Sequence, residues 1–171
     1  MYFRFAKKAR VLVLQTNGSG VLSFAGVSAS AGQVIQVVTA TDQTARSTTS
    51  TSFVTASNTL SVTITPSSTA NKILILVSAS VAAPLNNGWF TIYRGATDLG
   101  NTSNSRGMAV AYGSDATSAA EFNIGINHLD SPNTTSATTY QVYFRSNAAG
   151  ATVYLNGNST KGNITCLEIK G

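Results

Sequence analysis

The residues able to do acid, base or nucleophilic chemistry are few and far apart in this sequence. His128 is the only histidine, and the carboxylates form no close pair. The six acids are Asp42, Asp98, Asp115, Glu121, Asp130 and Glu168. A nucleophilic triad needs a base beside the nucleophile, and two-carboxylate glycoside hydrolysis needs two acids across a cleft. We therefore predict a protein that is not an enzyme, and leave open only a site shared between subunits.

Metal and cofactor sites are not indicated either. Cys166 is the only cysteine, which excludes an intramolecular disulfide and a cysteine-cluster zinc site. Calcium needs several oxygen ligands at close spacing, which the scattered acids do not supply. Because His128 continues the apolar face of Ile124 and Ile126, we expect it to pack inward or at the rim of the core. We expect no cofactor, and we expect Cys166 to fill space in a strand.

The positive charge is concentrated at the N-terminus. The first ten residues contain four basic residues and no acid, whereas the rest of the chain contains seven basic residues and all six acids. The predicted anchoring residues are Tyr2, Phe3, Arg4, Phe5, Lys7, Lys8 and Arg10. Cations and aromatic rings in this mixture suit either nucleic acid or an acidic protein surface. We favour docking on a protein, because the nearly neutral remainder offers no footprint on which a nucleic acid could continue.

No secretory or membrane segment is expected. The opening residues combine charge with apolar side chains, but the apolar run that follows, 11–14, is four residues long. A secretory segment needs about 7–15 apolar residues and a membrane span about 20. We therefore expect no membrane partner.

Strand signals dominate the rest of the chain. Alternation with a period of two is clear in 60–65 and 121–130, whereas sustained helical periodicity is absent. We predict a buried strand at 33–41, a central strand that is apolar on both faces at 72–81, and a hairpin signal at Asn156-Gly157. The remaining expected strands are 89–94, 108–112, 140–145, 151–155 and 163–170, and the hydroxyl-rich stretch 44–52 is a long loop or edge strand.

These strands predict an all-β fold with two packed antiparallel sheets. About eight strands follow one another at spacings typical of a sandwich or barrel. We predict an extended N-terminal arm at 1–31 and an antiparallel β-sandwich at 32–171. The arm contains two short apolar pieces, 11–15 and 21–24, separated by a turn signal. Because they cannot bury themselves alone, we expect them to pair with something else in an assembly.

The composition favours a component of an assembly. Only 10% of the residues are charged, against about 25% in an ordinary soluble domain. Threonine, serine and asparagine replace much of the missing charge. This surface suits a protein held at high local concentration, and it favours self-association.

Several phrases, taken in order, resemble a module of tailed-bacteriophage virion proteins, especially those of phages of marine and aquatic bacteria. They are Gly18-Ser19-Gly20-Val21-Leu22-Ser23-Phe24, Gly32-Gln33-Val34-Ile35-Gln36, Ser61-Val62-Thr63-Ile64-Thr65-Pro66-Ser67-Ser68, Asn71-Lys72-Ile73-Leu74-Ile75, Leu129-Asp130-Ser131-Pro132 and Ile164-Thr165-Cys166-Leu167-Glu168-Ile169. The match covers most of 18–171, and 1–17 departs from it. Proteins of this kind are tail-fibre or virion structural components, and similar jelly rolls form trimeric knobs, fibre tips and capsid decorations.

The resemblance implies a jelly-roll-like virion subunit on the exterior of a capsid or tail. We expect the arm to dock on the major capsid protein or on tail proteins, and the sandwich to form a homotrimer that faces outward. The alternative is a carbohydrate-binding module for a host surface glycan. Its candidate contacts are Trp89, Tyr93, Tyr112, Tyr143 and Tyr154. Alternation places Tyr143 and Tyr154 opposite the apolar residues of their strands, so both should face solvent, a partner subunit or a glycan.

Overall fold

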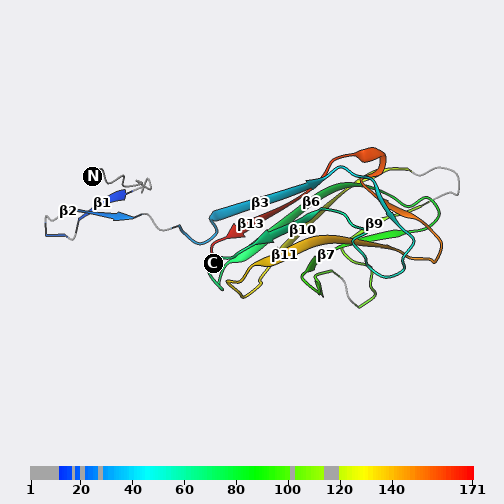
Figure 1. Cartoon of the computed structure of the whole chain (residues 1–171). Helices are drawn as coiled ribbons and strands as arrows, with labels where there is room; N and C mark the ends of the chain where they lie inside the picture. The colour runs from blue at the N-terminus through cyan, green and yellow to red at the C-terminus, as the bar shows by residue number, and fades with distance from the viewer. Residues whose placement is uncertain (1–11, 17, 20–21, 27–28, 101–102, 114–119) are drawn as a thin grey trace, which may run out of the picture.

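Nearly all of the regular structure is β-strand (Figure 1). The computed structural model describes residues 12–16, 18–19, 22–26, 29–100, 103–113 and 120–171. In these ranges the only helical element is a short 3-10 turn, η1 (Gly157–Ser159). No helix in the described part of the chain is long and apolar enough to cross a membrane. The all-β prediction is confirmed, because alternation with a period of two produces strands with one inward face.

Two antiparallel sheets pack against each other and enclose the core (Figure 1). The first sheet contains β3 (Val34–Asp42), β4 (Arg46–Thr48), β6 (Lys72–Ala82), β10 (Phe122–Asp130), β12 (Val153–Leu155) and β13 (Gly162–Ile169). The second sheet contains β5 (Ser61–Ile64), β7 (Gly88–Arg94), β8 (Thr97–Asp98), β9 (Ala109–Ala111) and β11 (Thr138–Ser146). The predicted β-sandwich is therefore confirmed.

The strand order is that of a jelly roll. In the first sheet β3 pairs with β13, β13 with β6, and β6 with β10. In the second sheet β5 pairs with β11, β11 with β7, and β7 with β9. The first and last strands of the body thus lie side by side, and the chain passes between the sheets in the eight-strand interleaving of a jelly roll. The short strands β4, β8 and β12 extend this framework.

The core lies between the inward faces of β6, β7 and β11. The rings of Phe90 and Phe144 stack with their centroids 5.9 Å apart and an interplanar angle of 8°. Around them are fully or almost fully buried residues from both sheets: Ile73, Ile75, Val77, Ile92, Tyr140, Val142, Val153, Leu155 and Ile164. Removing aliphatic and aromatic side chains of this size from water stabilises a fold by about 1.5–3 kcal/mol each. No disulfide is needed to close such a core.

Part of the predicted arm forms a hairpin. β1 (Leu12–Thr16) and β2 (Leu22–Gly26) pair antiparallel, with Leu14 opposite Phe24. Among the described residues these two strands make a sheet of their own and pair with neither sheet of the sandwich. The two apolar pieces of the arm therefore pair with each other.

The predicted buried strand at the start of the body is exposed, so this prediction was wrong. The side chains of Val34, Ile35 and Val37 are 49%, 39% and 59% accessible. The reason is the position of β3 at the edge of the first sheet, where it pairs only with β13 and only one of its faces meets the core. Val38 and Ala40 are the residues of β3 that pack against the core.

The prediction for 72–81 is correct in position and wrong in burial. β6 is central, since β10 lies along one side of it and β13 and β12 lie along the other. Its burial alternates nevertheless: Ile73 and Ile75 are fully buried, whereas Leu74 and Leu76 are only half-buried. The outward residues of β6 are therefore mixed: Leu74 and Leu76 are apolar, whereas Lys72, Ser78 and Ser80 are polar.

Asn156-Gly157 turns the chain but does not make the predicted hairpin. Asn156 has the left-handed conformation, with φ 55° and ψ 44°. The strands on either side of it, β12 and β13, both pair with β6: Leu155 lies opposite Val81, and Asn163 lies opposite Ser78. The two strands therefore follow one another along the same side of β6, and a hairpin turn would have folded them against each other.

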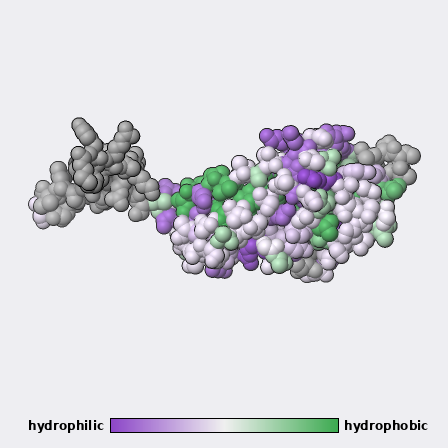
Figure 2. All heavy atoms as spheres, in the orientation of Figure 1, coloured by the Kyte–Doolittle hydropathy of each residue, from purple (hydrophilic) through white to green (hydrophobic). Residues whose placement is uncertain are grey.

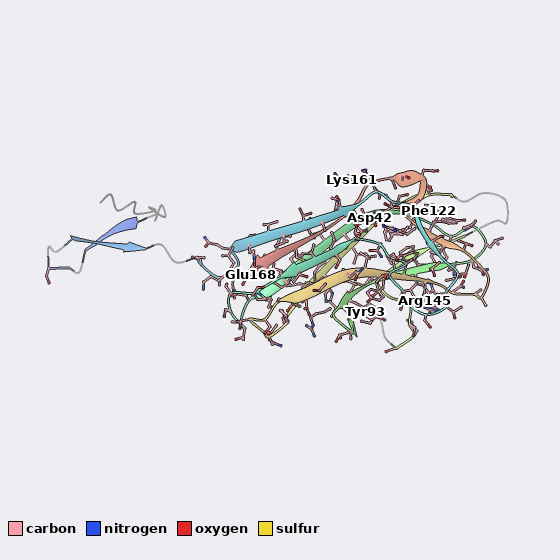
Figure 3. All side chains as sticks on the ribbon, viewed as in Figure 1. Asp42, Tyr93, Phe122, Arg145, Lys161 and Glu168 are labelled. Atoms are coloured by element: carbon pink, nitrogen blue, oxygen red, sulfur yellow. The ribbon has the colours of Figure 1, made fainter. Side chains whose placement is uncertain are left out.

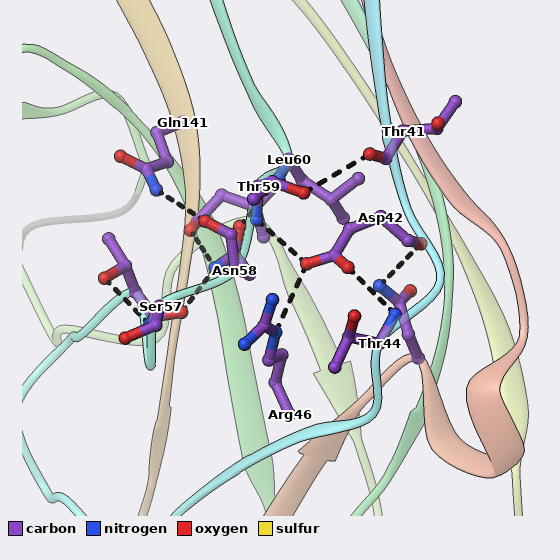
Figure 4. A network of polar contacts seen from close by, with 12 residues as sticks. Thr41, Asp42, Thr44, Arg46, Ser57, Asn58, Thr59, Leu60 and Gln141 are labelled. Carbon is purple, nitrogen blue, oxygen red and sulfur yellow. Dashed lines mark hydrogen bonds and ion pairs between the residues drawn. The ribbon is translucent and has the colours of Figure 1, made fainter.

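A buried carboxylate joins the end of β3 to the next segments (Figure 4). Asp42 accepts hydrogen bonds from the backbone N–H of Thr44 and of Thr59, both at 2.8 Å, and it forms an ion pair with Arg46 at 3.3 Å. Burial opposes the ionisation of Asp42, but these donors outweigh it and hold the pKa of Asp42 below its ordinary value. The network fixes the hydroxyl-rich stretch after β3 to the domain.

Candidate binding surface on the outer face of the second sheet

The outer face of the second sheet carries an aromatic cluster. Tyr93 of β7 and Tyr143 of β11 stack with their ring centroids 4.1 Å apart, and Phe53 meets Tyr93 edge to face at 6.3 Å. Trp89 stands at the start of β7, opposite Arg145 of β11. Figure 3 shows Tyr93 and Arg145 along the same side of the molecule. We call Phe53, Trp89, Tyr93, Tyr143 and Arg145 the aromatic cluster.

Arg145 holds this cluster and the neighbouring loops together. Its guanidinium donates hydrogen bonds to the carbonyl oxygens of Ser105, Thr51 and Ser146 over distances of 2.7–3.2 Å. The same group lies over the ring of Trp89, 3.9 Å from its centroid, and 5.3 Å from the ring centroid of Phe53. Burial lowers the pKa of Arg145. The positive charge of Arg145 is stabilised by the dipoles of the carbonyl groups and by the faces of the aromatic rings.

A cavity of about 500 Å³ opens beside Trp89. It is lined by Asn87, Trp89, Arg106, Gly107, Met108, Ala109, Val110, Tyr112 and Asn147. Two hydrogen bonds join Asn87 to Asn147. The backbone N–H of Asn87 donates to the side-chain oxygen of Asn147 at 3.1 Å, and the backbone N–H of Asn147 donates to the carbonyl of Asn87 at 3.0 Å. The lining thus combines two aromatic rings, two amides and one cation, and it contains no carboxylate. Such a mixture suits a polar ligand with an apolar face.

The two tyrosines proposed as interface or glycan contacts lie on different sheets. Tyr143 is in β11, where it stacks on Tyr93 and is half-buried. Tyr154 is in β12 of the first sheet and is 36% accessible. It lines a separate cavity of about 300 Å³ that also contains Glu121 and Asn158. Both tyrosines point away from the core, as their alternation predicted, but the fold does not bring them together.

Of the other aromatic candidates, Trp89 and Tyr112 line the same cavity, whereas Tyr93 belongs to the stack. The anchoring residues predicted from the sequence lie outside the described residues. They are Tyr2, Phe3, Arg4, Phe5, Lys7, Lys8 and Arg10.

His128 and Cys166 share one inward row of the first sheet. His128 of β10 lies opposite Ile75 of β6 on one side, and Cys166 of β13 lies opposite the same residue on the other side. His128 is half-buried, and Cys166 is fully buried. Burial raises the pKa of the Cys166 thiol to about 12. These positions agree with a packing histidine at the rim of the core and a cysteine that fills space.

The carboxylates form separate structural networks. Asp130 forms an ion pair with Arg94, with both carboxylate oxygens 2.9 Å from the guanidinium, and accepts a 2.7 Å hydrogen bond from the Tyr140 hydroxyl. Burial and this hydrogen bond raise the pKa of Tyr140. Glu168 of β13 accepts three hydrogen bonds, from the backbone N–H and the hydroxyl of Ser67 and from the side-chain amide of Asn71. Within the described ranges, no three histidine, cysteine or acidic residues gather closely enough to hold a metal ion.

No protein-family model and no curated protein matches this sequence. Among solved structures, the infectious bursal disease virus VP2 subviral particle is similar, with 12% identity and a TM-score of 0.41, over 92% of this chain and 41% of that chain. Dimeric latent PorU from Porphyromonas gingivalis is similar over 84% of this chain and 14% of that chain, with 8% identity and a TM-score of 0.38. The chain therefore spans less than half the length of each of these structures. Neither likeness bears on function.

Four residues of this surface were not singled out from the sequence. Arg145 looked like the last residue of a strand, Asn87 and Asn147 looked like ordinary turn residues, and Arg106 stood in a polar loop. The available signal was a basic residue directly opposite an aromatic residue in neighbouring strands. That signal needs the register of β7 against β11, which pairs Trp89 with Arg145, 56 positions further along the chain.

Proposed function

We propose that this chain is a non-enzymatic structural subunit of a virion. The observation that carries the proposal is an uncovered apolar row on the outer face of its jelly roll. Val37 lies opposite Leu167, Leu167 opposite Leu74, and Leu74 opposite Leu129, so one apolar residue from each of four strands stands in line. Val37 and Leu129 are 59% and 51% accessible. A contiguous apolar surface of this kind marks a site of association.

The charge distribution supports the same function. Charged residues make up 10% of the chain, so there is little electrostatic repulsion to oppose close packing of copies. The basic and aromatic residues at the N-terminus supply a separate attachment signal. We infer a homotrimer on the exterior of a capsid or tail, attached through 1–10 to the major capsid protein or to tail proteins.

Within this class we favour a small subunit of a tailed phage, either a capsid decoration or a tail-fibre component. The ordered phrases that resemble phage fibre modules support this assignment. The test is to image particles that carry the full chain with a small fused marker. Marker density at capsid lattice points identifies a decoration, and density at the tail identifies a fibre component. Particles that lack the marker after purification would refute the proposal.

A matched variant tests the attachment. Replacing Arg4, Lys7, Lys8 and Arg10 by glutamine removes the charge and keeps side chains of comparable length. We expect the variant to fold and to be lost from particles. The control replaces the exposed Lys72, Lys161 and Arg106 by glutamine, and it should still be incorporated.

A carbohydrate-binding module is the second candidate, and the cavity beside Trp89 favours it. Stacking rings, amides and a cation are the groups that bind sugars and orient them. We expect glycan-array binding by the full chain to be lost in Tyr112→Ala and retained in Tyr154→Ala, which changes the other cavity. Equal binding by both variants would assign the sugar to another surface.

A further inference from the structure

The two long outer strands of the first sheet each pair on one side only. Within the described residues, β3 pairs with β13 alone and β10 pairs with β6 alone. Each of the two strands is nine residues long, and in Figure 1 β3 forms the upper border of the sheet. Alternate N–H and C=O groups of an outer strand point away from its neighbour, so both strands offer hydrogen bonds to a further strand. We call these two sides the open edges.

The open edges lack the residues that keep sheet edges apart in monomeric proteins. Such edges are protected by lysine, by proline or by inward-pointing charges. β3 contains no lysine, arginine or proline, and neither does β10. Their acids, Asp42 and Asp130, are the last residues of the strands, where they are buried and form ion pairs with Arg46 and Arg94. No fixed charge along either edge would therefore repel a second strand.

Apolar side chains are exposed along both open edges. They are Val34, Ile35 and Val37 on β3, and Phe122 and Leu129 on β10. Figure 2 shows hydrophobic atoms gathered over the start of β3. A strand added at either edge would remove such side chains from water, which favours the pairing.

The middle of the outer face is a poorer contact than its edges. Lys72 of β6 stands on this face opposite Ile169 of β13. At the far end of β3, the Thr59 hydroxyl already donates to the Thr41 carbonyl at 3.3 Å. The part of β3 available to a further strand is therefore 34–40.

The strand directions select β10 of a second copy as the partner of β3. The strands β3, β13, β6 and β10 run in alternating directions, since each pairs antiparallel with the next. A β10 strand from a copy in the same orientation would lie antiparallel to β3 and continue this alternation. Pairing of β3 with another β3 would instead leave the β10 edges of both copies open.

The apolar row across the sheet indicates the register of this contact. Val37 is the β3 end of the row, and Leu129 is its β10 end. With Leu129 of the second copy opposite Val37, the row continues from one copy to the next. A register set by two outward residues also keeps every other side chain on its own face of the sheet.

We propose that β3 of one copy pairs antiparallel with β10 of a second copy and so extends the first sheet from subunit to subunit. The inference rests on the proposed function as a self-assembling subunit and names the strands that join. Because the two strands are different surfaces, the contact is heterologous, and it closes into a ring or continues as a filament according to the rotation between copies. A ring of three removes both open edges of every copy and is the homotrimer of the proposed function.

Disulfide trapping in a double variant tests the pairing. Val37→Cys/Leu129→Cys puts one thiol on each open edge. Within a chain, these positions are three strand spacings apart, or about 14 Å, which is too far for a disulfide. The native Cys166 is fully buried and does not compete. We expect mild oxidation, alkylation and denaturing electrophoresis to give a covalent trimer as the largest product.

Three variants serve as matched controls. Val37→Cys and Leu129→Cys, each alone, should give single chains, because the residue opposite each thiol carries none. Val37→Cys/Tyr112→Cys should also give little linked product, since Tyr112 is exposed beside β9 of the second sheet. If Val37→Cys alone links as readily as the double variant, β3 pairs with β3 and the proposal is overturned. A ladder beyond three chains would support the strand pairing and overturn the trimer.

Amide hydrogen exchange distinguishes paired edges from two sheet faces packed together. Val37→Lys places on the edge the kind of charge that protects monomeric proteins. We expect this variant to be monomeric and folded, and to lose the protection that the amides of β3 and β10 show in the wild-type assembly. Tyr112→Lys is the control and should keep the trimer and the protection of both strands. Unchanged exchange in β10 of a monomeric Val37→Lys variant would overturn the pairing.

Solution mass separates this inference from the function on which it rests. If the wild-type chain is a trimer and the double cysteine variant gives no linked product, the strand pairing is wrong and the structural role stands. A monomeric wild-type chain at micromolar concentration, with no linked product, would count against both.

Discussion

Arg145 and Trp89 lie opposite each other on adjacent strands, with the guanidinium carbon 3.9 Å from the centroid of the indole ring. No carboxylate is paired with Arg145 among the described ion pairs, and its donors are used by backbone carbonyls of three segments. The pair joins the strand β11 to the loops that border the Trp89 cavity. A cation in this position acts as a structural clamp.

We therefore expect Arg145→Met to destabilise the protein by about 2–4 kcal/mol, since the change takes the donor from the carbonyl oxygens of Thr51, Ser105 and the buried Ser146 and removes the stacked cation. Urea denaturation followed by tryptophan fluorescence measures the loss. Arg106→Met is the matched control: Arg106 is exposed and 6.0 Å from the same ring centroid, so the change should stay within about 0.5 kcal/mol. If Arg145→Met and Arg106→Met lower the free energy of unfolding equally, Arg145 does not act as a structural clamp.

Tyr140→Phe tests the buried network at the end of β10. The substitution removes a donor to Asp130 and leaves the ion pair between Asp130 and Arg94 in place. We expect a loss of about 1–3 kcal/mol in the free energy of unfolding, because a hydrogen bond to a charged, buried acceptor is lost. Tyr112→Phe, at an exposed tyrosine, should change stability little. If Tyr140→Phe leaves the free energy of unfolding unchanged, a water molecule replaces the hydroxyl as the donor to Asp130.

Glu168 should make the stability depend on pH. Burial opposes its ionisation, but hydrogen bonds from Asn71 and from the N–H and hydroxyl of Ser67 outweigh this and lower the pKa of Glu168 from 4.5. A carboxylate with a lower pKa in the folded chain stabilises the fold above the unfolded pKa and loses this contribution as the pH falls through the folded value. We expect the free energy of unfolding to fall progressively below about pH 4.5.

The substitution Glu168→Gln keeps an acceptor for the same donors and removes the charge. Chemical denaturation from pH 7 to pH 3 should give a flatter profile in this variant than in the wild type. The exposed Glu121→Gln is the control and should leave the profile nearly unchanged. If both variants follow the wild-type curve, Glu168 is not the group responsible.

Cys166 should be unreactive in the folded protein. Its side chain is fully buried, and its pKa is raised to about 12, so almost no thiolate exists at pH 8. We expect a thiol reagent to label the native chain only at the rate of unfolding and to label it within seconds in 6–8 M urea, as followed by absorbance. Rapid labelling of the native chain would place Cys166 at an accessible surface.

The sequence by itself determined the all-β class, most strand positions and the outward direction of Tyr143 and Tyr154. These properties are local, because alternation with a period of two places each side chain on one of two faces. It also located the basic charge at the N-terminus, since charge can be counted without a structure.

Only the tertiary structure decided which outward faces stay uncovered and which residues meet on them. Val34, Ile35 and Val37 looked like core residues in the sequence, and their exposure follows from the position of β3 at a sheet edge. The row from Val37 to Leu129 and the pair of Trp89 with Arg145 depend on the register of strands that are distant in sequence. Register is fixed by cross-strand packing over the whole sheet, so no local pattern specifies it.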